Sequence, residues 1–420
     1  MKYQNTLAHA LQLDREDPLS EIRQKFHIPK DSFGNEWLYF TGNSLGLQPK
    51  QTQHYIQQEL DDWAKLGVEG HFEAQNPWLS YHEFLTDKMA KIVGAKPLEV
   101  VVMNTLTTNL HLLMVSFYKP STKKYKIVIE SDAFPSDRYA VQSQLKFHGF
   151  NVEEGLIEWK PRSGEELLRI EDLEEIIEKQ GDEIALLLIG GVNYYTGQYL
   201  DIKRIAKIGH AKECMVGIDL AHGAGNIQPN LHESGVDFAA WCTYKYLNAG
   251  PGSLSGLFVH EKHAHNKELP RFAGWWNHNK ETRFNMRQPF DVMAGAEGWQ
   301  LSNPPILSMA AIRSSLDLFD AVGMDALREK SEKLTGYFEY LINGIDTDRI
   351  RIITPINPKE RGCQLSIQVK NADKTLHEQL MKHHIITDWR EPDVIRCAPV
   401  PMYTSFEDVF KMVEILKSLV

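Results

Sequence analysis

The chain has 420 residues and a formal net charge of −10 at pH 7, from 46 basic and 56 acidic residues. This length exceeds that of one ordinary domain, and the fractions of apolar and charged residues, 42% and 24%, are those of a globular protein. Because the balance is acidic and no run of Lys or Arg occurs, a nucleic acid and an acidic membrane surface are not the expected partners.

The sequence gives no sign of export or of a membrane span. The strongest apolar run, residues 184–192, is too short to cross a bilayer and suits a buried parallel strand. The first residues lack the apolar core of a signal peptide. The cysteines, which show neither close pairing nor metal-ligand spacing, predict reduced thiols, a cytoplasmic protein and no metal site; they are Cys214, Cys242, Cys363 and Cys397.

Residues 1–93 are predicted to be mainly helical. A polar helical segment over 1–30 ends near Pro29, and residues 36–40 form a strand that leads into a glycine-punctuated turn. An amphipathic helix follows over 49–66, and a further helix runs to about residue 93 after an irregular loop.

Between about 100 and 260, short apolar runs alternate with helical patterns, which predicts a mainly parallel sheet with helices on both faces. The clearest strands are 126–130, 184–189, 215–219 and 238–242, with helices over 137–148 and 201–212. From 305 onward, a long helix, a strand over 364–369 and a helix over 405–420 form an α+β pattern. We therefore predict a large domain over 72–304 and a small domain made of 1–71 and 305–420.

Two of these apolar strands lead to charged residues. Asp219 ends the strand 215–219, and Lys245 follows the strand 238–242. In an open α/β sheet, ligands bind outside the carboxyl ends of the strands, so both side chains should lie over one crevice. A lysine that forms a Schiff base and an aspartate that holds a pyridinium nitrogen are what pyridoxal 5'-phosphate (PLP) requires.

The neighbours of Lys245 favour this interpretation. Trp241 and Tyr244 form an aromatic setting that disfavours the charged amine, and only the neutral amine attacks an aldehyde. The simpler alternatives are that Lys245 is an ordinary exposed lysine, that Asp219 caps a helix and that His222 has a structural role.

Two further segments suit the same cofactor. Leu106 and Thr107 lie where a turn meets a helix N-terminus, which suits a phosphate or a simple cap. The run 134–137 offers the ring of Phe134 for stacking, beside Ser136 and Asp137, although Phe134 alone would pass for a core residue. Two other motifs fail. Residues 250–256 depart from the glycine spacing of the dinucleotide-binding motif. Residues 260–265 depart from the zinc-binding motif H-E-x-x-H and are predicted to form a histidine-rich helical surface.

These segments belong to an ordered set of motifs that resembles the kynureninase family of fold-type-I PLP enzymes. The set spans residues 42 to 403, and its members are 42–49, 103–113, 134–137, 195–198, 219–222, 244–250, 302–307, 361–365 and 396–403. The resemblance implies an α/β fold of the aspartate-aminotransferase type, with a mainly parallel large domain and a small α+β domain. It also implies a homodimer with shared active sites. The implied reaction is hydrolysis of L-kynurenine or 3-hydroxy-L-kynurenine to L-alanine and an anthranilate, in tryptophan degradation and NAD precursor supply.

The resemblance also implies roles for individual residues. Lys245 is the Schiff-base lysine and general base, Asp219 the partner of the pyridinium nitrogen, and Tyr195 a proton carrier. Arg396 pairs with the substrate carboxylate. The implied cofactor-binding residues are Leu106, Thr107, Phe134, Ser136, Asp137, Tyr195, His222 and Tyr244, with Trp275 and Asn303 from the partner subunit. The implied substrate-binding residues beside Arg396 are Ser44, His71, Ser302 and Asn303, of which His71 and Asn303 indicate a preference for 3-hydroxykynurenine.

The chain departs from the family pattern at two positions. Gly190 and Asn193 stand where the family often has serine and histidine, which removes one possible hydrogen bond to the cofactor and changes the support around it. The rival functions are another fold-type-I enzyme, such as an aminotransferase, a cysteine desulfurase or a selenocysteine lyase, and a non-catalytic scaffold. A desulfurase needs a nucleophilic cysteine on a mobile loop, and the nearest candidate, Cys363, adjoins a predicted strand and reads as packed. A scaffold tends to lose Lys245 or Asp219, and both are present.

Overall fold

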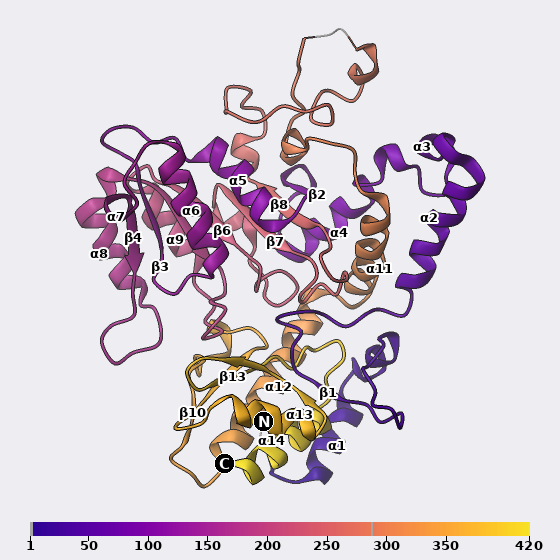
Figure 1. Ribbon diagram of the computed structural model, residues 1–420, viewed down its shortest axis with the longest axis vertical. Helices are drawn as coiled ribbons and strands as arrows, with labels where there is room; N and C mark the ends of the chain where they lie inside the picture. Colours follow the sequence, from indigo (N-terminus) through magenta and orange to yellow (C-terminus); the bar gives the residue numbers. More distant parts are fainter. Residues whose placement is uncertain (1–2, 287–288) are drawn as a thin grey trace.

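The computed structural model describes residues 3–286 and 289–420, which form two lobes built on two sheets (Figure 1). The larger lobe holds a seven-stranded sheet in the order β2-β8-β7-β6-β5-β3-β4, in which only β8 runs against its neighbours. The mainly parallel sheet predicted from the sequence is therefore confirmed. Its strands are β2 (Val100–Met103), β3 (Lys126–Glu130), β4 (Leu156–Trp159), β5 (Ile184–Gly190), β6 (Met215–Asp219), β7 (Phe238–Cys242) and β8 (Ser255–Val259).

Alternation along each strand builds a separate core on each face of this sheet. In β2, Val100 and Val102 join one core while Val101 and Met103 join the other. Because successive side chains of a strand point to opposite faces, a sheet covered on both sides needs apolar residues at every position. Helices α5 (Leu106–Phe117) and α6 (Pro135–Phe147) cover one face; α4 (Glu83–Val93), α8 (Ile170–Gln180), α9 (Ile202–His210) and α11 (Ile306–Val322) cover the other.

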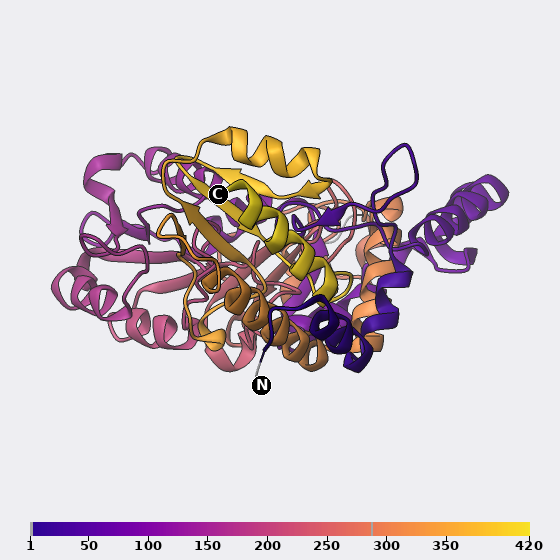
Figure 2. The same ribbon diagram turned by 90° about the horizontal axis from the view of Figure 1, so that it is seen from below.

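The smaller lobe combines both ends of the chain. Its antiparallel sheet has the order β12-β13-β10-β9 and packs with helices around a third core. From the N-terminal segment, β1 (Leu38–Tyr39) pairs in parallel with β11 (Ile385–Ile386), and α1 (Leu7–Glu16) lies beside α14 (Phe406–Leu419) (Figures 1 and 2). The other elements are α12 (Met324–Asn343), α13 (Lys374–Lys382), β9 (Ile350–Ile352), β10 (Leu365–Val369), β12 (Asp388–Arg390) and β13 (Val394–Cys397).

The start of α14 shows why α1 is held there. Ser405 accepts a hydrogen bond from the backbone N–H of Asp408, and the Asp408 carboxylate accepts one from that of Ser405. Asp14 of α1 accepts two more, from the N–H groups of Phe406 and Glu407. The free N–H groups of a helix N-terminus attract such carboxylates, so this contact ties α1 to α14.

Several predicted elements need adjustment. The predicted helical segment 1–30 is α1 followed by a 3-10 turn, Ser20–Lys25. The single long helix expected from 305 is two helices, α11 and α12, separated at Gly323, whose φ of +79° ends the first helix. The strands 126–130, 215–219 and 238–242 are confirmed residue for residue.

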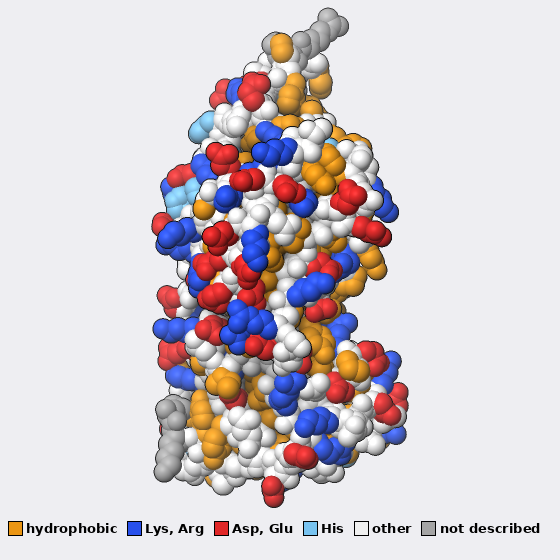
Figure 3. Space-filling view, turned by 90° about the vertical axis from the view of Figure 1, so that its left-hand side faces the viewer, with side chains coloured by type: hydrophobic (Ala, Val, Ile, Leu, Met, Phe, Trp, Pro, Cys, Tyr) orange, Lys and Arg blue, Asp and Glu red, His pale blue; other side chains and the backbone are white. Residues whose placement is uncertain are grey.

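The division into domains at 71/72 and 304/305 stays a prediction. In the structure, α2 (Thr52–Leu66) and α11 pack against each other, and α11 also packs against α4 (Figure 1). These two helices therefore border the larger lobe, while α1, β1 and the elements from α12 onward form the smaller one. No helix among residues 3–286 and 289–420 is both long and apolar enough to cross a membrane. Acidic and basic side chains are interspersed on the face shown in Figure 3.

A buried carboxylate connects three elements of the larger lobe. Asp237, just before β7, accepts hydrogen bonds from His210 Nε2 (2.9 Å) and the backbone N–H of Val216 (2.8 Å) on one oxygen. Its other oxygen lies 2.9 Å from His263 Nε2 and 2.8 Å from Lys262 Nζ. The predicted helical surface over 260–265 includes a 3-10 helix, Glu261–His263, in which His263 is half-buried against Asp237.

Replacing this carboxylate is expected to destabilise the fold. Burial alone would raise the pKa of Asp237, but the hydrogen bonds from His210, His263 and Lys262 outweigh it and lower the pKa. We expect Asp237→Asn to reduce the free energy of unfolding at pH 7 by about 3 kcal/mol, measured by urea denaturation.

The pH dependence has a defined sign. Because the folded-state pKa lies below the unfolded value of about 3.9, the contribution of Asp237 is complete above that pH and is lost below it. The difference between wild type and variant should therefore shrink below about pH 4. The exposed Asp182→Asn serves as control; equal denaturation midpoints for Asp237→Asn and wild type would show that the carboxylate is dispensable.

Candidate active site

The carboxyl ends of the parallel strands meet at one edge of the large sheet. Strand register pairs Gly190 at the end of β5 with Asp219 at the end of β6, and Asp219 with Ala240 of β7. The chain beyond β7 then brings Lys245 over the same edge. A cavity of about 370 Å³ opens here, and Asp219 and Lys245 both line it. The predicted juxtaposition of these two residues is confirmed.

Lys245 is held by an imidazole. Its Nζ lies 2.9 Å from His222 Nε2 and 5.9 Å from the centroid of the Phe134 ring. Burial lowers the pKa of His222 well below its usual value, and the charge of Lys245 lowers it further, so the ring is neutral and Nε2 accepts from the amine. Within the part of the chain that the structure describes, the buried Nδ1 of His222 has no hydrogen-bond partner.

Two carboxyl groups lie together beside Lys245. Asp219 is buried and accepts a hydrogen bond of 2.6 Å from the backbone N–H of Ala221. Burial raises the pKa of Asp137 well above its usual value, and the charge of Asp219 raises it further. The two carboxyl groups thus lie close enough to disfavour the ionisation of both at once.

A polar end of the cavity lies at the start of α5. Leu106 and Thr107 form the first turn of this helix, and Thr107 Oγ1 lies 2.8 Å from Ser136 Oγ. Free N–H groups and hydroxyls at a helix N-terminus suit a phosphate. The Phe134 ring remains 46% exposed and lines the cavity, and Tyr244 also lines it. The residues present therefore fit a flat, phosphorylated pyridine aldehyde: two hydroxyls, an aromatic face, a buried carboxylate and an amine.

Glu130 explains the glycine at position 190. Glu130 ends β3, is buried, and its Oε1 accepts a hydrogen bond of 2.8 Å from the Gly190 N–H. A Cβ at position 190 would lie 2.7 Å from that oxygen, which is closer than normal packing allows. Burial raises the pKa of Glu130 to about 7. In this chain a carboxyl group thus approaches the backbone where a serine side chain is often found in the family.

We expect Gly190→Ala to destabilise the protein by about 1–3 kcal/mol, because the methyl group displaces Glu130 and leaves a buried polar group unpaired. The melting temperature measures this effect. Gly344→Ala is the matched control, since its Cβ would meet its nearest atom at 3.4 Å, an ordinary contact. Equal melting temperatures for Gly190→Ala and wild type would contradict the role assigned to Glu130.

Asn193 shapes the turn after β5. Its Oδ1 accepts hydrogen bonds from the backbone N–H groups of Tyr195 (3.0 Å) and Thr196 (2.9 Å) and from the Thr196 hydroxyl (3.2 Å). A short amide oxygen suits such a turn. The second departure from the family pattern therefore supports the loop that carries Tyr194 and Tyr195.

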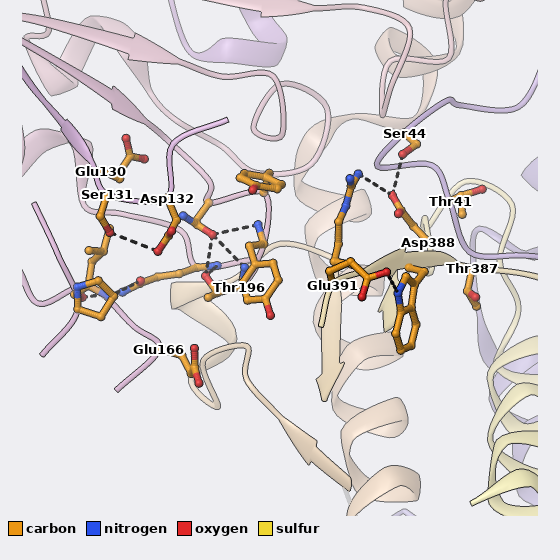
Figure 4. Close-up of a pocket in the computed structure, with 18 of the residues that line it drawn as sticks. Thr41, Ser44, Glu130, Ser131, Asp132, Glu166, Thr196, Thr387, Asp388 and Glu391 are labelled. Carbon is orange, nitrogen blue, oxygen red and sulfur yellow. Dashed lines mark hydrogen bonds and ion pairs between the residues drawn. The ribbon is translucent and has the colours of Figure 1, made fainter. Parts of the chain in front are cut away.

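Arg396 reaches the cavity from the smaller lobe. It lies in β13, is 1% exposed, and donates to the backbone O of Tyr194 at 2.6 Å and to the carboxylate of Asp388. Ser44 Oγ donates to the same carboxylate at 3.0 Å (Figure 4). Ser44 and Arg396 both line the cavity, so the two lobes and the N-terminal segment meet at this point.

A larger cleft of about 1310 Å³ adjoins the cavity between the lobes. Tyr195 lines this cleft, and burial raises its pKa to about 12, while its neighbour Tyr194 lines both spaces. The structure thus places Tyr194 and Tyr244, and not Tyr195, at the cavity beside Lys245. Figure 4 shows the lining of the cleft, which includes Glu130, Asp388 and Glu391.

Besides Tyr195, four predicted residues lie outside the cavity of this single chain. Trp275 is exposed and its Nε1 donates to the backbone O of Arg283. Ser302 and Asn303 are exposed and His71 is half-buried. The roles of all four residues stay predictions. Those of Trp275 and Asn303 depend on a partner subunit. The sequence interpretation missed Asn43, Tyr194, Asp388 and Arg390; only the turn residue Asn43, inside the motif 42–49, carried a signal.

The cysteines are free and buried. Cys363, the nearest candidate for a desulfurase nucleophile, has its pKa raised to about 12 by burial. A thiol of this kind is a poor nucleophile because the thiolate is the reactive form. The interpretation of Cys363 as packed is confirmed, and its inertness stays a prediction.

Comparisons with known proteins agree with this geometry. Residues 327–416 match the family described as Kynureninase C-terminal domain. The kynureninase of Myxococcus xanthus is 55% identical over 415 residues, which cover 99% of this chain and 97% of that protein. The kynureninase of Flavobacterium psychrophilum is 54% identical over 420 residues, 99% of each chain.

Solved structures share the fold at low identity. A cysteine desulfurase from Thermococcus onnurineus superposes with a TM-score of 0.76 at 18% identity, over 95% of this chain and 97% of that one. A cysteine desulfurase from Escherichia coli gives a TM-score of 0.76 at 15% identity, over 95% and 98% of the two chains. The fold is therefore that of the fold-type-I class of pyridoxal-phosphate enzymes. Within that class, the chain belongs to the kynureninase family.

Proposed function

We propose that this protein hydrolyses L-kynurenine or 3-hydroxy-L-kynurenine to L-alanine and anthranilate or 3-hydroxyanthranilate, with PLP as cofactor. The observation that carries the proposal is the convergence of Lys245, Asp219 and Arg396 on one cavity. Relatives with more than half of their residues identical over nearly the whole chain are kynureninases. Tryptophan degradation and NAD precursor supply are the pathways that this activity would serve.

The residues that would hold the cofactor follow from their positions. The start of α5, with Thr107 and Ser136, would bind the phosphate; Phe134 would stack on the ring and Asp219 would pair with its nitrogen. Lys245 would hold the aldehyde carbon covalently. When bound, the cofactor withdraws the electrons released as bonds to the substrate's Cα and Cβ break.

The chain's own groups then handle protons and orientation. Lys245 Nζ would act as the base for the Cα proton of a bound substrate, and His222 would orient the amine through the 2.9 Å contact. Arg396 holds the substrate carboxylate, because a guanidinium fixes both the position and the angle of its partner. Tyr195 lies in the adjoining cleft, so its proposed part in moving a proton at the γ-carbonyl requires the substrate to extend into that space.

We further propose that the active enzyme is a homodimer in the cytoplasm. The described residues 266–286 and 289–294 project from the larger lobe (Figure 1) and expose large apolar side chains, a composition typical of an interaction surface. These side chains are Phe272, Trp275, Phe284, Met286 and Phe290. In a dimer, Trp275 and Asn303 would complete the neighbouring site. Sedimentation equilibrium should give twice the mass of the 48.1 kDa chain; a monomer that is fully active would refute the shared site.

The test of function uses purified protein with PLP and each candidate substrate. We expect a visible cofactor band, a rise in anthranilate fluorescence with L-kynurenine, and release of L-alanine. Steady-state kinetics on both substrates test the preference for 3-hydroxykynurenine that His71 and Asn303 indicate. A cofactor band with sulfide release from cysteine and no anthranilate would favour the desulfurase alternative, and the absence of any band would refute the cofactor.

A further inference from the structure

A second arginine shares the carboxylate that holds Arg396. Arg390 NH2 lies 3.2 Å from Asp388 Oδ2, the oxygen that also accepts from Arg396 and Ser44. Register places Asp388 opposite Arg396 and Arg390 opposite Val394 on the paired strands β12 and β13. The strand pairing therefore fixes two guanidinium groups around one carboxylate.

At the Asp388 carboxylate itself, positive charge exceeds negative charge, because two guanidinium groups share this one carboxylate. The other two carboxylates of the hairpin accept hydrogen bonds from neutral donors and do not contact either guanidinium group through an ion pair. Glu391 accepts from Trp389 Nε1, and Asp393 accepts from Gln368 Nε2. Among residues 3–286 and 289–420, the buried Nε atoms of Arg390 and Arg396 have no hydrogen-bond partner. Two guanidinium groups that share a single carboxylate and line the cavity favour an added anion there.

Tyr194 sets the position of both cations relative to the cofactor residues. Its ring centroid lies 5.9 Å from Arg390 Cζ, 5.8 Å from Arg396 Cζ and 5.4 Å from the Phe134 ring, which it meets edge to face. Both arginines line the cavity that contains Lys245, and Arg390 also lines the larger cleft. An anion bound between the guanidinium groups would thus lie at the junction of the two spaces.

We propose that Arg390 is a second carboxylate-binding residue for the substrate, acting together with Arg396, while Asp388 is the internal counterion that holds both. The inference rests on the proposed function for the identity of the anion, the substrate's α-carboxylate. This carboxylate supplies a second negative charge to the pair of guanidinium groups. Two guanidinium groups balanced by two carboxylates form a neutral cluster, which fixes the substrate's Cα against Lys245 more tightly than Arg396 alone.

The test compares Arg390→Gln with wild type on L-kynurenine. Loss of one charge-assisted contact should raise KM by about 10- to 100-fold and leave kcat within about threefold. Arg390→Lys keeps the charge but not the planar fork, so its KM should lie between the two. Arg351→Gln is the matched control, because Arg351 lies in β9, pairs with Glu166 and lines neither space.

A ligand without the carboxylate identifies the group that Arg390 binds. The inhibition constant of the decarboxylated amine of kynurenine should be equal for Arg390→Gln and wild type. Equal weakening of the amine and of kynurenine would assign a general packing role to Arg390 and overturn the proposal. A lower PLP affinity with unchanged KM would assign Arg390 to the cofactor phosphate, and a KM equal to that of wild type would also overturn the proposal.

Failure of the proposed function can be recognised separately. If wild type releases no anthranilate from either substrate, the proposed reaction fails. L-Alanine, monitored by the change that it causes in the cofactor band, then probes the same subsite as a simple amino acid carboxylate. Weaker alanine binding by Arg390→Gln would still support the role of Arg390 in binding a carboxylate, and equal binding would refute it.

Discussion

Lys245→Ala is expected to reduce kcat for kynurenine hydrolysis by about 10⁴-fold or more, because the variant loses both the covalent attachment of the cofactor and the base for the Cα proton. Its Nζ is the amine held 2.9 Å from His222 Nε2. The measurements are anthranilate release and the visible absorbance of the protein reconstituted with PLP, which should lose the band of the lysine-bound cofactor.

The control for this change is Lys203→Ala, at an exposed position of α9. It should keep the absorbance band and full activity. Retained turnover by Lys245→Ala within about tenfold of wild type would contradict both its covalent and its proton-transfer roles, since either role alone contributes at least about 10²-fold.

Asp219→Asn is expected to lower kcat/KM by about 10²- to 10³-fold, because a fixed charge aimed at the reacting group is lost while the size of the side chain is kept. The amide oxygen of the variant can accept the same hydrogen bond from the Ala221 N–H, so the fold should be retained. Circular dichroism and the melting temperature check folding, and steady-state kinetics give the loss.

Asp237→Asn is the matched comparison for Asp219→Asn, because both residues are buried aspartates on neighbouring strands. Asp219 is the last residue of β6, and Asp237 directly precedes β7. The structure assigns stability to Asp237 and chemistry to Asp219. The first variant should lose stability and keep its kcat/KM once folded, and the second should show the reverse. The same profile for both variants would mean that Asp219 has only a structural role.

The sequence predicted the centre of the site well because its signals are local. The strands that lead to Asp219 and Lys245 are continuous apolar runs followed by charge, and the sheet rule then places the two residues together. The start of α5 and the ring of Phe134 were found for the same reason, since each directly follows a recognisable strand.

The rest of the site and the border between the lobes depend on contacts between segments that are far apart in the sequence. Asp388 and Arg390 enter the site through the pairing of β12 with β13, and short strands carry little information about their partners. Tyr194 and Tyr195 lie in an irregular turn where no period tells which side chain faces the cavity. The helix α11 packs against α2 across some 250 intervening residues, so the border of the lobes was not visible in sequence order.

The joining of both chain ends in the smaller lobe has a consequence for synthesis of the protein. Ser44 contacts a carboxylate 344 residues later in the chain, and β1 pairs with β11. During translation, the first 45 residues therefore emerge long before their partners exist, while the larger lobe can already collapse. Contacts of such sequence separation form late and slowly. Apolar side chains of this segment, such as Leu13 and Phe40, therefore stay without their core partners until the C-terminal elements of the smaller lobe have been made.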